Sequence, residues 1–75
     1  MDWKQYISSD PAVLHGAVCL SGTRVPVSVV LDSLAANETP ERILQQYPSL
    51  KREHILAAIA YAADLARERI VPMPA

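Results

Sequence analysis

The stretch Thr39–Tyr61, TPERILQQYPSLKREHILAAIAY, decides the fold of this chain of 75 residues. Thr39 is placed to cap a helix with its hydroxyl, and Pro40 suits the first helical position because its missing N–H would be unpaired there anyway. Pro48 ends that helix, since proline cannot donate to the hydrogen-bond ladder. A longer apolar-periodic run begins within a few residues. Two helices joined by so short a turn form a helix-turn-helix, which serves both DNA binding and purely structural helical cores.

Hydrophobic periodicity predicts a helix before this motif, over residues 26–36, and places the last helix from residue 51 or 52 to about residue 69. The core-facing stripe of the earlier helix comprises Val27, Val30, Leu31, Leu34 and Ala35. Asn37 is expected to take a left-handed conformation just after this helix. The core face of the last helix is predicted to comprise Ile55, Ile59, Ala62, Ala66 and Ile70. The short apolar run 17–20 reads as a strand, paired with residues 6–8 or with its copy in a partner chain.

The chain is expected to be one domain, with an N-terminal arm and short strands (1–22), a three-helix core (26–70) and a tail (71–75). A domain of this size buries roughly 60% of its unfolded surface and often needs disulfides, metals or oligomerisation for stability. Cys19 is the only cysteine, which excludes a disulfide within the chain. His15 and His54 lack cysteines at ligand spacing, so no metal site is predicted. We therefore expect a homodimer.

Charge and composition limit the function. Seven lysines and arginines face eight acidic residues, for a net charge of −1, whereas a domain that holds DNA alone is usually basic. No apolar run approaches the ~20 residues of a membrane span, and the first residues, MDWKQY, lack a signal-type apolar core. A cytoplasmic protein is expected. The sequence has no Gly-rich phosphate loop and no carboxylate–histidine array, so neither catalytic residues nor a cofactor are predicted.

Basic residues gather where the second helix of the motif begins. Lys51, Arg52 and His54 open the helix that normally meets base edges, and Arg42 and Arg24 are placed for backbone phosphates. Double-stranded DNA is therefore a candidate partner.

Arg24 also has a structural interpretation, because it follows a tight connection. Gly22 can take a positive φ without steric cost, and the Thr23 hydroxyl can satisfy backbone donors at the turn. We favour an internal salt bridge of Arg24 with Asp10 or Asp32 over a phosphate contact.

A second surface is predicted to bind protein. One side of the last helix, with His54, Ala58, Tyr61 and Leu65, is unusually apolar for a solvent face, and such patches mark interaction sites. The alternative is that the alanines serve helix propensity and Tyr61 folds over the surface. The candidate interface residues are Trp3, Ala58, Tyr61, Leu65, Val71 and Met73.

The two ends of the chain contribute to that set with open alternatives. Trp3 belongs to a strand or extended arm that covers the core, or it binds a partner. Val71 and Met73 lie among prolines that prevent a helix, and they either dock in a groove or belong to a frayed tail.

Nearly the whole chain resembles a known family. The residues that carry the resemblance are His15-Gly16, Leu20-Ser21-Gly22-Thr23-Arg24-Val25-Pro26-Val27, Leu34-Ala35, Ile43-Leu44, Tyr47-Pro48, Ile55, Ala58, Tyr61 and Ala62, with Trp3, Ile7 and Asp10-Pro11. They resemble the domain-of-unknown-function family 433, whose members look like small VapB-type antitoxins. The resemblance implies a mainly α fold, with a homeodomain-like or winged-helix-like three-helix core behind an N-terminal β element. It also implies a toxin partner of the PIN-like nuclease type.

Three positions depart from the family pattern. Val18 stands where members tend to have proline, Ser21 where they tend to have a basic residue, and Lys51 where a threonine often caps the last helix. A lysine cannot accept a backbone amide, so the cap must shift to Ser49 or be lost. Lys51 and Arg52 also lie at the positive end of the helix dipole, where an anion such as a DNA phosphate would offset the cost.

The expected function is the antitoxin of a type II toxin–antitoxin pair. Such a protein binds and neutralises a PIN-like nuclease and can also bind operator DNA. The alternative is a solitary DNA-binding helix-turn-helix regulator without a toxin partner.

Overall fold

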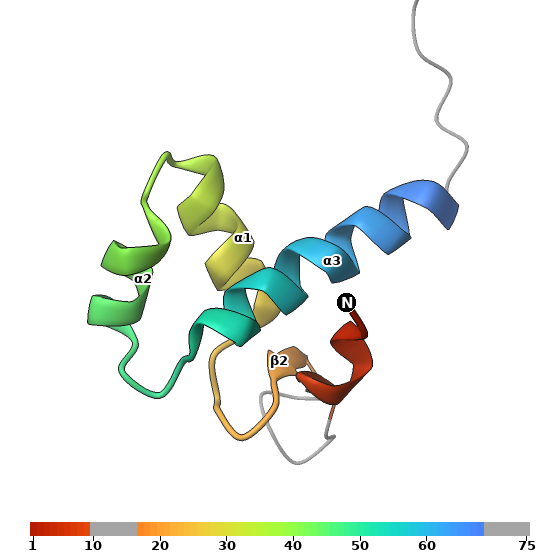
Figure 1. Ribbon diagram of the computed structural model, residues 1–75, viewed down its shortest axis with the longest axis horizontal. Helices are drawn as coiled ribbons and strands as arrows, with labels where there is room; N and C mark the ends of the chain where they lie inside the picture. Colours follow the sequence, from red (N-terminus) through yellow and green to blue (C-terminus); the bar gives the residue numbers. More distant parts are fainter. Residues whose placement is uncertain (10–16, 69–75) are drawn as a thin grey trace, which may run out of the picture.

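The computed structural model describes residues 1–9 and 17–68. They form a 3₁₀ turn, η1 (Trp3–Gln5), two strands, β1 (Ile7–Ser9) and β2 (Val18–Leu20), and three helices, α1 (Val27–Ala35), α2 (Pro40–Gln46) and α3 (Arg52–Glu68). In Figure 1, α1 and α2 lie at the N-terminal end of the long helix α3, and η1 and the strands lie below it. The protein is mainly helical with a short β element, as the sequence predicted.

The two strands form an antiparallel sheet within one chain. Ile7 pairs with Leu20 and Ser9 pairs with Val18. This confirms the predicted strand and, of its two predicted partners, the one in the same chain. The sheet places the fully buried side chain of Leu20 in the core cluster that it shares with the helices.

The turn after β2 has the predicted local structure. Gly22 has a φ of 79°, in the region that glycine enters without steric cost. The Thr23 hydroxyl donates to the Leu20 carbonyl at 2.7 Å and accepts from the Val25 N–H at 3.1 Å. The side chain of Thr23 thus holds the chain as it turns toward α1.

The ends of α1 and α2 also follow the sequence signals. Asn37, between the two helices, has a φ of 68°. The Thr39 hydroxyl accepts from the Arg42 N–H at 3.2 Å, and Pro40 occupies the first turn of α2. α2 ends at Gln46, ahead of Pro48.

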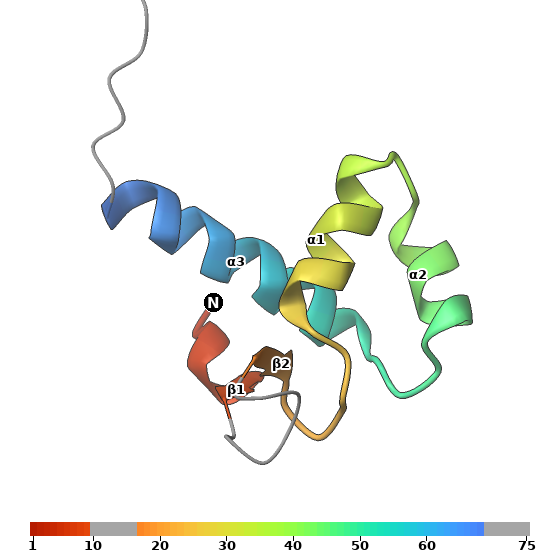
Figure 2. The same ribbon diagram turned by 180° about the vertical axis from the view of Figure 1, so that it is seen from behind.

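The N-terminus is tied to α3 and does not form the predicted extended arm at Trp3. Asp2 caps η1 by accepting from the Lys4 N–H at 3.1 Å. The Trp3 ring lies edge-on to Tyr61, with 5.0 Å between ring centroids, and its indole N–H donates to the carboxylate of Asp64. Figure 2 shows η1 beneath the middle of α3 from the opposite side. Trp3 therefore covers the core from a helical turn.

The core lies where α1, α2, β2 and α3 meet. Its buried cluster comprises Leu20, Val27, Val30, Ile43, Leu50, Ile55 and Ala58. In α1, Val27 and Val30 are buried and Leu31 and Leu34 pack against the cluster, as predicted. Ala35 is exposed, contrary to its predicted place in the stripe.

The predicted core face of α3 is wrong by a rotation of the helix. Ile55 is buried, but Ile59 is 46% exposed and Ala66 is exposed. Ala57 and Ala58, both fully buried, lie against the neighbouring elements instead. The physical reason is that α3 is apolar on two sides, so periodicity alone does not choose between them. The fifth predicted core residue, Ile70, lies outside the described residues.

Candidate functional site

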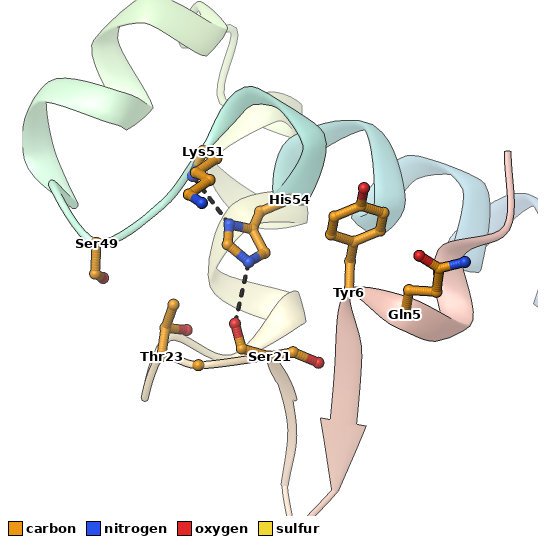
Figure 3. A pocket seen from close by; sticks show the side chains of 8 residues that line it. Gln5, Tyr6, Ser21, Thr23, Ser49, Lys51 and His54 are labelled. Carbon is orange, nitrogen blue, oxygen red and sulfur yellow. Dashed lines mark hydrogen bonds between the residues drawn. The ribbon is translucent and has the colours of Figure 1, made fainter.

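A cleft of about 320 Å³ opens where the N-terminal turn, the turn after β2 and the start of α3 meet (Figure 3). Its lining residues are Gln5, Tyr6, Ser21, Gly22, Thr23, Ser49, Lys51 and His54. None of them is acidic, and Lys51 is the one lysine or arginine among them. The hydroxyls and the ammonium group suit an oxygen-rich ligand group such as a phosphate or a carboxylate.

His54 forms the inner wall of this cleft. Its Nδ1 accepts from the Lys51 backbone N–H at 2.9 Å, and its Nε2 lies 3.1 Å from the Ser21 carbonyl oxygen. An accepting Nδ1 and a carbonyl partner at Nε2 define the neutral tautomer with the proton on Nε2. The Tyr6 ring lies edge-on to the imidazole, with 6.0 Å between centroids.

This geometry corrects two predictions from the sequence. His54 is only 7% exposed and both ring nitrogens are engaged, so it is not available to base edges or as a general base. It also supplies the missing cap of α3. Its side chain reaches back from the first turn to the Lys51 N–H, as a glutamate or glutamine does in a capping box. The cap therefore did not shift to Ser49, which is exposed.

Arg52 also has a partner within the chain. Its guanidinium lies 2.9 Å from the Glu41 carboxylate and joins the starts of α2 and α3. The pKa of the Glu41 carboxyl lies below its ordinary value of 4.5. The largest cause is a hydrogen bond from the backbone of Glu41 itself, and the second is the hydrogen bond from Arg52. Glu41 thus supplies an anion at the positive end of α3, where a DNA phosphate was one candidate. Both side chains are well exposed, so solvent and salt screen the pair and it contributes little to stability.

The other three predicted DNA contacts remain on the surface. Arg24, Arg42 and Lys51 are exposed, and none forms an ion pair within residues 1–9 and 17–68. The predicted salt bridge of Arg24 with Asp32 is therefore absent from this part of the chain. Its other predicted partner, Asp10, lies outside the described residues.

Three of the predicted interface residues meet at the second half of α3. Leu65 is 42% exposed and follows Tyr61 by one helical turn, and Tyr61 contacts Trp3. We call Trp3, Tyr61 and Leu65 the aromatic patch. Ala58 is fully buried, so its predicted place in the interface is wrong. Val71 and Met73 lie outside the described residues.

Asp64 lies beside the aromatic patch and gives it a pH dependence. The pKa of the Asp64 carboxyl lies below its ordinary value of 3.8. The largest cause is the hydrogen bond from the indole N–H of Trp3, and the second is the hydrogen bond from the Arg67 guanidinium. A folded-state pKa below the unfolded one means that the contribution to stability is complete above the unfolded pKa. It is lost as the pH falls through the folded pKa.

We therefore expect Asp64→Asn to remove this acid dependence. As the pH is lowered from neutral to below 3.8, the unsubstituted chain should lose stability relative to the variant. Urea unfolding followed by the fluorescence of Trp3, the only tryptophan, measures the difference. A stability difference that stays constant over this range would contradict the contact.

The described residues show no further reactive centre. No group of three or more His, Cys, Asp or Glu in this part of the chain could hold a metal ion. Cys19 is a free thiol, but it is only 3% exposed. No helix among the residues described here is long and apolar enough to cross a membrane.

Comparison with known proteins gives one family. The family model for "Protein of unknown function (DUF433)" matches residues 7–62. The uncharacterized protein y4eO of Sinorhizobium fredii is 42% identical over 59 residues, which are 79% of this chain and 27% of that protein. This chain thus spans about a quarter of that relative's length.

A solved structure shares the fold. The crystal structure of a DUF433 member from Anabaena variabilis superposes with a TM-score of 0.75 at 25% identity. The match covers 87% of this chain and 64% of the other one. The family match spans the core and most of the cleft, whereas Trp3 and Leu65 of the aromatic patch lie outside it.

Proposed function

This chain belongs to the DUF433 family, and we propose that it is the antitoxin of a type II toxin–antitoxin pair. In this role it is a protein-interaction module that binds and neutralises a PIN-like nuclease. The observation that carries the proposal is the exposed Leu65 beside the Trp3–Tyr61 ring pair. Tryptophan and tyrosine often supply most of the binding energy of a protein interface. The kind of partner comes from the resemblance to VapB-type antitoxins.

The surroundings of the aromatic patch also support protein binding. In Figures 1 and 2 the end of α3 extends past η1 and past the other helices, so a partner can approach it. Asp64 and Arg67 interact with each other beside the patch, and Lys4 is exposed nearby on η1. An apolar centre with a charged rim is the usual arrangement of a protein interface.

DNA binding is a second activity in this proposal. We take the three helices as a homeodomain-like core in which α2 and α3 form the helix-turn-helix. Arg24, Arg42 and Lys51 then supply exposed cations for backbone phosphates. The solvent face of α3, however, presents Leu56 and Ile59 where a recognition helix presents polar side chains. This favours a protein partner over the alternative, a solitary DNA-binding regulator.

A matched pair of leucine variants tests the proposal. Leu65→Asp should weaken binding to the proposed partner, a PIN-like nuclease, by about 30-fold or more, as loss of an interface hot spot does. Leu56→Asp places the same charge on the same helix, at a leucine that is 51% exposed on the opposite side, and should leave that affinity unchanged. Titration calorimetry measures both.

Each other outcome has a definite meaning. Equal affinities for Leu65→Asp and the unsubstituted chain would show that the aromatic patch is not the toxin-binding surface. A different outcome is that the unsubstituted chain binds no product of a neighbouring gene and retards the DNA upstream of its own gene in a gel shift at low salt. That result would support a solitary DNA-binding regulator and contradict the antitoxin proposal.

A further inference from the structure

The solvent side of α3 carries a second apolar surface, on the side of the helix away from the aromatic patch. Leu56 is 51% exposed and Ile59 is 46% exposed, although side chains of this type are normally buried. Three alanines that are exposed or half-buried continue the surface toward the end of the helix. We call this set the outer strip: Leu56, Ile59, Ala60, Ala63 and Ala66.

The spacing of the outer strip is that of a coiled-coil seam. Leu56, Ile59, Ala63 and Ala66 alternate in steps of three and four residues, which are the a and d positions of a heptad. The buried residues Ala57 and Ala58 hold the b and c positions, so the seam points away from the core. A seam on the solvent side has the pattern that a partner helix requires.

Side-chain sizes along the seam fit an antiparallel copy of the same helix. In an antiparallel pair an a position lies across from a d position of the partner. Leu56 then faces the partner's Ala66, and Ile59 faces the partner's Ala63. Large side chains opposite small ones fill the space between two helices without voids.

The charges beside the seam fit the same arrangement. The e positions are Glu53, Ala60 and Arg67, and e positions face each other in an antiparallel pair. Glu53, which forms no ion pair within the described residues, then meets the partner's Arg67, and symmetry repeats the pair. Arg67 contacts Asp64 on its own helix, but its side chain is 72% exposed and accessible to a second carboxylate. A parallel pair would instead place Arg52, at a d position, beside its own copy.

We infer that α3 pairs with α3 of a second copy of this chain, antiparallel and about a two-fold axis near Ala60. The outer strip is then the interface of a homodimer. The inference does not depend on the antitoxin proposal, because the aromatic patch lies on the other side of α3. Each protomer of the dimer keeps its aromatic patch free.

Sedimentation equilibrium of the full chain and of Ile59→Asp tests this inference. The unsubstituted chain should be a dimer. The variant should be a monomer, with the dissociation constant of the dimer raised by at least about 100-fold, because the interface would enclose two carboxylates without partners. Gln45→Asp, at an exposed position of α2, is the matched control and should remain a dimer. Far-ultraviolet circular dichroism and Trp3 fluorescence show that each variant is folded.

A charge exchange tests the antiparallel orientation separately. Glu53→Arg should raise the dissociation constant about tenfold, because the introduced guanidinium would then oppose the partner's Arg67 twice per dimer. Adding Arg67→Glu to the same chain should restore most of the affinity of the dimer. Each ion pair then forms again with its two charges exchanged between positions 53 and 67.

Every result decides the inference. A chain that is monomeric at all concentrations, or a dimer that persists in Ile59→Asp, would overturn it. If the chain were monomeric and Ile59→Asp abolished toxin binding while Leu65→Asp did not, the outer strip would be the toxin surface. A dimer lost in Ile59→Asp, with no toxin bound by the unsubstituted chain, would support the inference and contradict only the proposed function.

Discussion

Ile55→Ala should lower the free energy of unfolding by about 2–5 kcal/mol, whereas Ile59→Ala should lower it by less than about 1 kcal/mol. The two isoleucines are one turn apart on α3. Ile55 is only 1% exposed and belongs to the core cluster, so the substitution leaves a cavity. Ile59 is 46% exposed, so the loss of its side chain leaves none. Folded domains are stable by only about 5–15 kcal/mol, and Ile55→Ala is expected to remove a large part of that margin.

Urea denaturation followed by far-ultraviolet circular dichroism measures both losses. The protein should be kept below the concentration at which it dimerises, so that Ile59→Ala reports folding alone. If the two variants lost equal free energy of unfolding, the result would support the core face predicted from periodicity. It would contradict the observed orientation of α3, in which Ile55 is buried and Ile59 is exposed.

His54→Ala should lower the free energy of unfolding by about 2–3 kcal/mol, because it leaves the Lys51 N–H and the Ser21 carbonyl without their partner. His54→Gln should cost clearly less. Glutamine is a usual residue at this position of a capping box, and its side-chain oxygen can accept from the Lys51 N–H. The same urea titration compares the two variants. Equal losses would mean that the packing of the ring beside Tyr6, and not the cap, accounts for the effect.

The local features of this fold could be predicted because single residues determine them. The cap at Thr39, the left-handed residue Asn37 and the glycine turn at Gly22 each depend on the conformational limits of one side chain. The strand β2 could be predicted from its short apolar run, and β1 was one of the two pairing partners that the sequence left open. None of these features requires knowledge of a distant part of the chain.

The rotation of α3 could not be predicted, because alanine fits either side of a helix. Ala58 is buried and Ala66 is exposed, and nothing in their own identity separates them. What decides is that η1, α1 and the strands pack against one side of α3. The contact between Trp3 and Asp64 joins residues 61 positions apart, so it left no local signal.

The cap at His54 did leave a signal that periodicity overlooks. Lys51 cannot cap α3, and a residue three positions later that can accept a hydrogen bond is the usual alternative. The place of His54 in the helix-turn-helix instead predicts a contact with DNA. The same reasoning predicts a DNA contact for Arg52, although the Glu41 carboxylate lies within ion-pair distance on the preceding helix.

The function proposed for this chain is tested most directly by growth of cells that express the PIN-like nuclease proposed as its partner. Co-expression of the unsubstituted chain should relieve the growth arrest and should yield a complex that purifies as one species. Leu65→Asp should fold but fail to relieve the arrest, and Leu56→Asp should relieve it fully. If the arrest persists while the unsubstituted chain is folded and abundant, this protein is not the antitoxin of that nuclease.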